Sequence, residues 1–332
     1  MELPRALRAA LDGELASLPA KRLAAVAAEL SQRYRTGTPA SGGKFARTRE
    51  EIAAYAAVRL PATFAATYAA LAQLQDRLPD WTPQTLLDAG AGPGTAMWAA
   101  ATLWPDLRHI TLLEREEGMI ALGKRLAAAA PLPAIEHATW LKVDLTGRWE
   151  LSPHDLVIAA YLLGELPQEQ QATLIQRLWA CTSGALVIIE PGTPAGFSRM
   201  KQARAHLLAA GARTIAPCPH DTPCPIPEND WCHFAQRIAR SRLHRQAKAG
   251  ELAYEDEKFS FAGMARLPGA AIHGRIIRHP QIRPGHIHFE LCTPQGLTST
   301  VVTRKQRALW ARARDLHWGE VMPASDNEEI RR

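Results

Sequence analysis

The sequence of 332 residues contains no run of 18 apolar residues, so it predicts no membrane-spanning helix and no membrane partner. Its opening residues, Met1 to Arg5, lack the basic segment and apolar core of a secretory signal peptide. The five cysteines are an odd number and occur without a secretion signal, which argues against a framework of disulfides. These absences predict a cytoplasmic protein whose cysteines serve a metal or catalytic chemistry.

The composition is that of a globular protein. Apolar residues make up 47% and charged residues 22% of the chain, and its length allows one to three domains with a large core. The formal net charge of +6 permits a polyanionic partner without requiring one.

One glycine-rich stretch, LLDAGAGPGT at residues 86–95, lies between a predicted strand and a predicted helix. Gly90, Gly92 and Gly94 allow the backbone to turn sharply and to approach a ligand closely. The N-terminus of the helix points free N–H groups at the same place. With Asp88 before the glycines, the spacing differs from the dinucleotide fingerprint and resembles motif I of S-adenosylmethionine-dependent methyltransferases. The alternative is a structural strand–helix turn with surface acids.

Acidic residues follow two neighbouring predicted strands. Glu114 ends the first and would accept the ribose hydroxyls, whereas Asp144 follows the second and would meet the adenine amino group. The carboxyl ends of parallel strands meet at one edge of a sheet, and the turn with Tyr161 and Glu165 belongs to that edge too. The predicted cofactor site therefore consists of Asp88, Gly90, Gly92, Gly94, Glu114, Asp144 and Tyr161.

Strands and helices alternate between residues 85 and 192, which predicts an α/β fold with a parallel, Rossmann-like sheet. A long helix near 48–78, interrupted at Pro61, precedes it, and strand-like runs near 272–278, 286–292 and 298–303 are expected to complete it. The predicted organisation is an N-terminal helical, basic region (1–80), a cofactor-binding core (81–195), a cysteine-rich, basic, metal-binding insertion (196–262), C-terminal strands with a basic helix (263–322) and a disordered tail (323–332).

The turn after the fourth predicted strand, AYLLGE at residues 160–165, lacks the Asn/Asp-Pro-Pro-aromatic pattern of methyltransferases that act on exocyclic amines. It also lacks the Pro-Cys nucleophile of pyrimidine-C5 enzymes. Tyr161 and Glu165 are the nearest polar side chains, and the sequence assigns no catalytic residue.

Four cysteines, Cys218, Cys224, Cys232 and Cys292, are expected to converge, while Cys181 stays on a helix. The gaps between the four are five, seven and 59 residues, so there is no tight pair of the kind found in structural zinc sites. A cubane iron–sulfur cluster is wider and needs four thiolates at its corners, so the spacing favours a cluster. Zinc with His220 or His233 as a ligand, and four unliganded thiols, remain alternatives.

Three basic segments could contact nucleic acid: residues 33–47, a predicted helix at 234–249, and residues 303–320, where tryptophans accompany the cations. The alternative is a set of solvated loops and helix faces. The candidate RNA-binding residues are Arg33, Arg35, Lys44, Arg237, Arg240, Arg304, Lys305 and Arg307.

The glycine loop, the IEPGTP loop at 189–194, the cysteine-containing run at 218–234 and the WGE at 318–320 together resemble a known family. The chain is similar, over nearly its whole length, to bacterial relatives of a mitochondrial small-subunit ribosomal methyltransferase-like family. The resemblance implies a Rossmann-like methyltransferase core, association with small-subunit rRNA and a 4Fe–4S cluster. By motif it implies Cys218, Cys224, Cys232 and Cys292 as cluster ligands and Gly90, Gly92 and Gly94 as the S-adenosylmethionine loop.

Two functions follow from this resemblance. One is an S-adenosylmethionine-dependent enzyme that methylates rRNA, favoured by the complete cofactor motif. The other is a non-catalytic assembly factor of the small subunit that binds RNA and retains the cofactor pocket and the cluster, favoured by the missing catalytic turn. A monomer is expected in either case.

Overall fold

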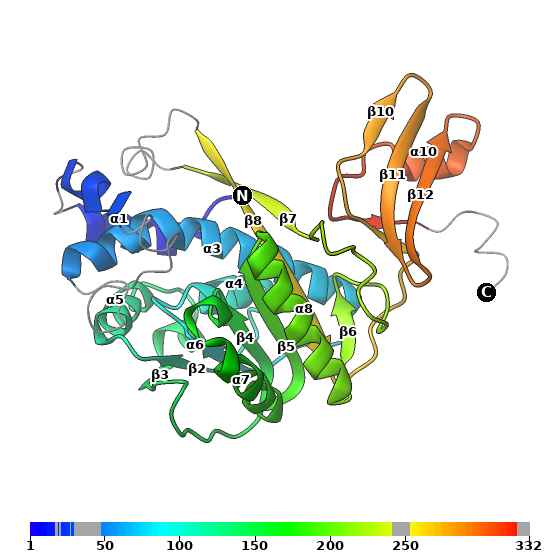
Figure 1. Cartoon of the computed structure of the whole chain (residues 1–332). Helices are drawn as coiled ribbons and strands as arrows, with labels where there is room; N and C mark the ends of the chain where they lie inside the picture. Colours follow the sequence, from blue (N-terminus) through cyan, green and yellow to red (C-terminus); the bar gives the residue numbers. More distant parts are fainter. Residues whose placement is uncertain (17–18, 20, 27, 30–47, 241–252, 324–332) are drawn as a thin grey trace.

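The computed structural model describes residues 1–332 except 17–18, 20, 27, 30–47, 241–252 and 324–332. A large sheet covered by helices forms the body, and a smaller C-terminal sheet projects from it (Figure 1). The predicted disordered tail and the candidates Arg33, Arg35 and Lys44 lie outside the described residues, apart from residue 323. Within the described residues, no helix has both the length and the apolar character that crossing a bilayer requires.

The main sheet has eight strands in the order β3-β2-β1-β4-β5-β8-β6, and β7 pairs with β8. Strands β1 to β5 are parallel, and β8 runs antiparallel to β5, β6 and β7. A single antiparallel strand between β5 and β6 completes a Rossmann-like methyltransferase sheet, which confirms the predicted α/β sheet, while the metal-binding insertion stays a prediction. The strands are β1 (Thr85–Ala89), β2 (His109–Glu114), β3 (Thr139–Lys142), β4 (His154–Ala160), β5 (Thr182–Pro191), β6 (Arg213–Ala216), β7 (Phe234–Ala239) and β8 (Tyr254–Ala265).

The strands expected to complete this sheet do not belong to it. Strand β8, which begins inside the predicted insertion, takes that place, and the later strands form a second, antiparallel sheet in the order β10-β11-β9-β13, with β12 on β11. Residues 259–265 of β8 are buried throughout, as a central strand requires. Strand β11 instead alternates buried and more exposed residues, which suits a sheet with one wet face. The bounds are β9 (Gly274–Ile276), β10 (Gln281–Arg283), β11 (His286–Thr293), β12 (Gly296–Thr303) and β13 (Val321–Met322).

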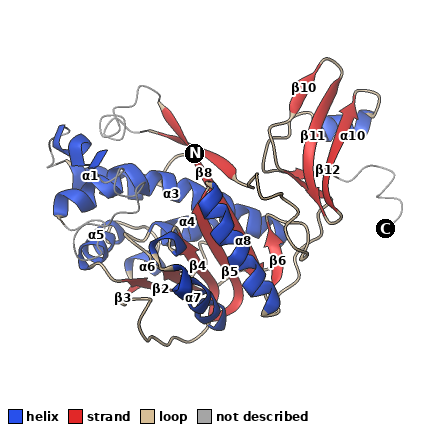
Figure 2. Cartoon of the chain, viewed as in Figure 1, coloured by secondary structure: helices blue, strands red, loops and turns tan. Residues whose placement is uncertain are grey.

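Helices cover both faces of the main sheet (Figure 2). Along β1, Leu86 packs into the core shared with α1, α3 and α4, whereas Leu87 packs into the core shared with α7 and α8. The helices are α1 (Arg5–Leu15), α3 (Arg49–Arg77), α4 (Thr95–Leu103), α5 (Glu117–Ala127), α6 (Pro133–Glu136), α7 (Gln168–Ala180), α8 (Pro194–Ala209) and α10 (Arg307–Ala313), with a 3-10 turn at Leu163–Glu165.

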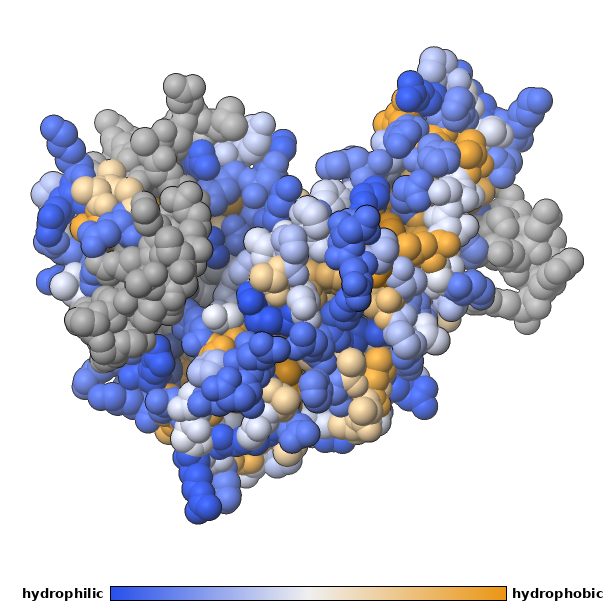
Figure 3. All heavy atoms as spheres, in the orientation of Figure 1, coloured by the Kyte–Doolittle hydropathy of each residue, from blue (hydrophilic) through white to orange (hydrophobic). Residues whose placement is uncertain are grey.

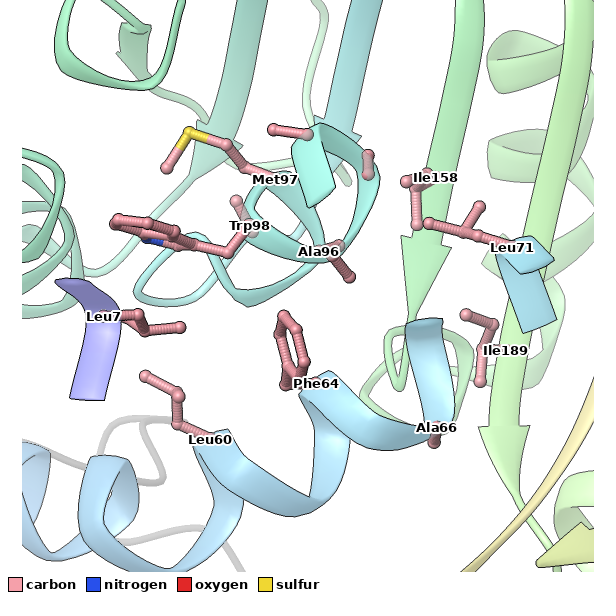
Figure 4. Packing of buried hydrophobic residues seen from close by; sticks show 14 of the residues in the cluster. Leu7, Leu60, Phe64, Ala66, Leu71, Ala96, Met97, Trp98, Ile158 and Ile189 are labelled. Atoms are coloured by element: carbon pink, nitrogen blue, oxygen red, sulfur yellow. The ribbon is translucent and has the colours of Figure 1, made fainter. Parts of the chain in front are cut away.

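Helix α3 is continuous through Pro61, so the predicted interruption is wrong. The helix begins with a capping box in which the Thr48 hydroxyl accepts from the Glu51 N–H and the Glu51 carboxylate accepts from the Thr48 N–H. A proline inside a helix costs about 3 kcal/mol. Fully buried side chains such as Leu60 and Phe64, which pack against α4 and the sheet (Figure 4), each return roughly 1.5–3 kcal/mol. Tertiary packing therefore outweighs the proline.

The segment expected to form a basic helix at 234–249 begins as a strand. In β7, Phe234 and Ile238 are buried while the residues between them are more exposed, which is a mixed pattern for a short edge ribbon. β7 pairs with β8 from Phe234↔Phe259 to Ala239↔Tyr254, and residues 241–252 lie outside the described part. For residues 234–239 the helix prediction is wrong, because pairing with β8 satisfies their backbone.

Candidate functional site

The loop between β1 and α4 forms the first part of the site. Gly90, Gly92 and Gly94 have φ angles of 68°, 54° and 81°, a region that other residues rarely adopt. A Cβ atom on Gly92 would meet no atom within 4 Å, whereas Gly90 lies against Leu162 and Gly94 against Trp140. The loop is therefore open to a ligand at Gly92 and closely packed on either side of it.

Glu114 at the end of β2 holds this loop in place. Its Oε2 accepts a hydrogen bond from the Gly92 N–H at 2.8 Å, and its Oε1 accepts from the N–H groups of Arg115 and Glu116, each at 2.8 Å. Burial raises the pKa of this carboxyl group, although the three backbone donors oppose that effect. Glu114 thus positions the glycine loop. The sequence predicted a contact with the ribose for this residue and did not indicate the positioning role.

Asp88 lies beneath the loop and is 1% exposed. It accepts a hydrogen bond from the Met97 backbone, and burial raises its pKa to about 7. Its Oδ2 has no hydrogen-bond partner within the described residues. A buried oxygen without a partner is costly, so this atom fits a site that receives a polar ligand.

Asp144 and Tyr161 follow β3 and β4 at the same edge of the sheet. Asp144 is exposed, and its Oδ1 accepts from the Thr146 hydroxyl and N–H, which lower its pKa. Tyr161 has a φ of 57°, unusual for a residue with a side chain, at the turn that follows β4. All seven predicted cofactor residues therefore lie at the carboxyl edge, and their roles stay predictions. Glu165, at the end of the same turn, is exposed.

A cluster that the sequence did not indicate lies beside Tyr161. Its hydroxyl donates to Glu257 Oε1 at 3.0 Å, and Arg59 Nη2 lies 3.3 Å from that same oxygen. The Arg59 guanidinium carbon lies 5.5 Å from the centroid of the Tyr161 ring. Arg59 comes from α3 and Glu257 from β8, 198 residues apart, so pattern along the chain could not join them. The signal available was one cation in the otherwise apolar run AAVRLPATF.

The cysteines form the second part of the site. Cys218, Cys224 and Cys232 lie on the loop between β6 and β7, Cys292 lies on β11, and all four line one cavity. Cys181 lies apart, at the end of α7, and donates to the Leu151 carbonyl. The predicted convergence is confirmed. As these side chains are arranged in the described residues, no group of three His, Cys, Asp or Glu is set to hold one metal ion.

Burial shapes the chemistry of this cavity. It raises the pKa of the Cys292 thiol to about 12 and that of Cys232 well above its ordinary value, and the neighbouring cysteines add to both shifts. The pKa of Cys218 is raised by burial as well, opposed by the charges of Arg204 and Arg275. Burial therefore favours the neutral thiol at Cys218, Cys232 and Cys292.

Two buried arginines brace the cysteine loop. Arg204 on α8 donates to the carbonyls of His220 and Thr222, and Arg275 on β9 donates to the carbonyls of Pro217 and Gly319. Each keeps one nitrogen, Arg204 Nε or Arg275 Nη2, without a hydrogen-bond partner in the described chain.

Both arginines also line the cavity with the thiols. Cations with unused N–H groups beside four thiols fit an anionic, sulfur-rich group bound by thiolates. The zinc alternative retains one geometric argument, because His220 Nε2 lies 3.5 Å from Cys292 Sγ. The ring of His233, the other histidine of the zinc alternative, stacks on Trp231 and meets Trp318 edge-on.

The predicted RNA-binding residues differ in their surroundings. Arg237 forms a two-point ion pair with Asp256, with both distances 2.8 Å, and Arg240 pairs with Glu255 at 3.1 Å. Arg304, Lys305 and Arg307 are exposed where β12 turns into α10, and only Arg307 belongs to the helix. The predicted basic helix is therefore shorter than expected.

The sheet order and the glycine loop at its carboxyl edge define a protein of the Rossmann-like methyltransferase fold class. In this chain the fold is accompanied by a cysteine-lined cavity and a second sheet. Comparison with known sequences then settles the family: the chain belongs to the family described as "Mitochondrial small ribosomal subunit Rsm22", which matches residues 49–323.

Two relatives show how similar the chain is to known sequences. The human mitochondrial ribosome assembly protein METTL17 is 32% identical over 291 residues, which cover 81% of this chain and 62% of that protein. The Rsm22-cox11 tandem protein 2 of Schizosaccharomyces pombe is 27% identical over 331 residues, covering 83% of this chain and 43% of that protein. The chain therefore spans less than two thirds of the length of either relative.

Solved structures with a similar course of the chain include two methyltransferases. Magnesium protoporphyrin IX methyltransferase of Synechocystis PCC 6803 with bound SAH has 13% identity and a TM-score of 0.42, covering 71% of this chain and 94% of that one. The plantazolicin methyltransferase BpumL has 12% identity and a TM-score of 0.42, with coverages of 74% and 96%.

Proposed function

We propose that this chain is an assembly protein of the small ribosomal subunit that binds rRNA, S-adenosylmethionine and an iron–sulfur cluster. The observation that carries the proposal is the cavity lined by four cysteines and two buried arginines, in a chain of the Rsm22 family. The name of its human relative, a mitochondrial ribosome assembly protein, supports the same function.

The glycine loop supplies the cofactor site of this proposal. The open space at Gly92 would receive S-adenosylmethionine, which supplies an activated methyl group when bound. Glu114 fixes the loop through the Gly92 N–H, and the unpartnered Asp88 Oδ2 offers a buried acceptor or, when protonated, a donor. Both residues act by positioning and binding, and neither needs to transfer a proton.

The cysteine cavity supplies the cluster site. Cys218, Cys224 and Cys232 on one loop, with Cys292 on the second sheet, would hold a 4Fe–4S cluster. Arg204 and Arg275 would offset its negative charge and donate to its sulfur atoms. Because three ligands come from a loop of the body and one from the second sheet, the bound cluster would cross-link the second sheet to the body of the protein.

Metal analysis of protein purified without oxygen tests the cluster. We expect about four iron and four acid-labile sulfide per chain for a cubane, with a broad visible absorption. Cys224→Ser should lose most of this iron, whereas Cys181→Ser, which alters the thiol outside the cavity, should retain it. Zinc in place of iron would support the His220 alternative, and no metal in either form would contradict the proposed site.

A second candidate function is methyl transfer to rRNA. The intact glycine loop, with Glu114 hydrogen-bonded to Gly92, favours it. The Arg59–Glu257–Tyr161 cluster at the end of β4 speaks against it, because these groups already satisfy one another where an acceptor would bind. Immature small subunits incubated with methyl-labelled cofactor decide between the two. Label in RNA that is lost with Gly92→Arg would establish the enzyme, and no label at any assembly stage would favour the assembly factor.

A further inference from the structure

The positive charge of the chain is concentrated at its C-terminal end. Residues 272–322, which contain β9 to β13 and α10, hold eight lysines and arginines and three acids, a net charge of +5. The whole chain carries +6, so all other residues together contribute +1. We call residues 272–322 the C-terminal module.

Strand register gathers part of this charge at one end of the module. Arg283 on β10 pairs with His286 on β11, and His286 pairs with Thr303 on β12. The Arg304 N–H donates to the Gly285 carbonyl at 3.1 Å, which joins the turn after β12 to the β10–β11 hairpin. Side chains about 20 positions apart in sequence thus meet at one place. We define the basic tip as Arg283, His286, Arg304, Lys305 and Arg307, all of them exposed.

Several other arginines that the structure describes are neutralised by a neighbouring carboxylate. Arg125, Arg199 and Arg237 each pair with a carboxylate at 2.7–2.8 Å. Within the described residues, the arginines and the lysine of the tip form no ion pair. Their charge is therefore available to an anionic partner.

The surface beside the tip is apolar and planar in part. Ile282 on β10 is 72% exposed, and Val301 on β12 is 43% exposed. The Arg304 guanidinium lies over the Trp310 ring, with its carbon 5.7 Å from the centroid. In Figure 3 the projecting module carries hydrophilic residues with hydrophobic patches between them. Cations next to apolar and aromatic surface suit the phosphates and bases of RNA.

We infer that the basic tip is a docking surface for the sugar–phosphate backbone of RNA. The inference rests on the proposed function and adds the surface that would make the contact. The opposite end of β11 lies in the cysteine cavity: Cys292 is six residues from His286, or about 20 Å along a strand. One strand therefore connects the RNA surface to the proposed cluster site.

Charge reversal tests the tip with the full chain. The tip variant is Arg283→Glu, Lys305→Glu and Arg307→Glu, and the control variant is Arg108→Glu, Lys124→Glu and Arg213→Glu, which alters three exposed cations of the body by the same total charge. The probes are small-subunit rRNA and immature small subunits, titrated at several salt concentrations.

We expect the tip variant to bind rRNA at least about tenfold more weakly, with a slope of log K against log salt shallower by about two, because each lost phosphate contact removes roughly 0.7–0.9 from the slope. The control variant should stay within about threefold of the wild type. Unchanged thermal unfolding and iron content would show that both variants fold.

Each other outcome overturns the inference in a recognisable way. Wild-type affinity and slope in the tip variant would remove the tip from the interface and leave the proposed function standing. Equal weakening in both variants would show an effect of net charge alone. Normal rRNA binding with loss of binding to subunits would make the tip a protein contact. If the wild type itself binds no rRNA, the proposed function fails as well.

Discussion

The glycine loop and the cysteine cavity are assembled in opposite ways. Residues 88–94 of the glycine loop are consecutive, and the carboxylate of Glu114 on the adjacent strand accepts a hydrogen bond from the Gly92 N–H. The cavity instead joins a loop at 217–233 to β11, with Cys232 and Cys292 separated by 59 residues. The glycine loop is held by hydrogen bonds within its own part of the chain, and only Asp88 Oδ2 beneath it lacks a partner in the described residues. The cavity gathers four thiols with two arginines that each keep one buried nitrogen without a partner in the described residues, so we expect it to depend more strongly on what it binds.

The largest expected effect follows from this dependence. Cys292→Ser should remove the one ligand that the C-terminal module supplies, and thereby release the module from the body. We expect the free energy of unfolding to fall by about 3 kcal/mol or more, and hydrogen exchange in β9 to β13 to increase more than in β1 to β5.

The control for this experiment is Cys181→Ser, which alters a buried thiol at the end of α7, outside the cysteine cavity. Hydrogen exchange in the module should be the same in the control and in the wild type. If Cys292→Ser loses its metal without faster exchange in the module, the cross-link between the two sheets is wrong even though the cysteines bind the metal.

Gly92→Arg tests the glycine loop, a site formed by consecutive residues. The new side chain would fill the open space of the loop, so we expect S-adenosylmethionine affinity to fall by about 100-fold or more, about 2.7 kcal/mol, in a calorimetric titration.

The chain offers a matched control in Gly211, which has a φ of 82° and equally open surroundings at the end of α8. Gly211→Arg carries the same backbone strain of about 1–2 kcal/mol and should bind the cofactor normally. If both variants lose affinity equally, strain and not occupancy of the loop is responsible.

Asp88 gives a pH-dependent effect in the protein without cofactor, and its change per pH unit is smaller than either effect above. Its pKa rises from 3.8 to about 7 on folding, so the folded state binds a proton that the unfolded state has released. The free energy of unfolding should therefore fall as pH rises from about 4 to about 7, by at most about 1.4 kcal/mol per pH unit. Asp88→Asn should remove this slope in thermal melts from pH 5 to pH 8. An identical slope in the variant would assign the pH dependence to other groups.

The contrast between the local glycine loop and the cavity built from distant segments also explains what the sequence could predict. The strand–loop–helix at 85–103 follows from local patterning, because glycine spacing and apolar period are properties of neighbouring residues. The placement of Asp88, Glu114 and Asp144 at one edge follows once the strands are parallel. Four cysteines of matching chemistry could be grouped without geometry, and the cavity confirms the grouping.

Long-range pairing could not be predicted. Strands β8 and β11 both combine polar and apolar residues, and only three-dimensional packing decides that β8 inserts between β5 and β6 while β11 joins a second sheet. The places of Arg204 and Arg275 could not be predicted either, because nothing in their local sequence shows that they are 3% exposed beside the thiols. The Arg59–Glu257 pair was missed for the same reason.

The Arg59–Glu257 pair provides the smallest expected effect. It tests the turn after β4, which lies at the same edge of the sheet as the glycine loop. Arg59 and Glu257 are partly exposed, so a double-mutant cycle of Arg59→Ala and Glu257→Gln should give a coupling energy of only about 1 kcal/mol. Tyr161→Phe should weaken that coupling, because the phenol also donates to Glu257. If the cluster only holds the β4 turn, cofactor affinity should change little in all three variants. A loss of affinity matching the loss of stability would instead make Tyr161 and its partners part of the cofactor site. The cofactor site would then depend on α3 and β8 as well as on the glycine loop.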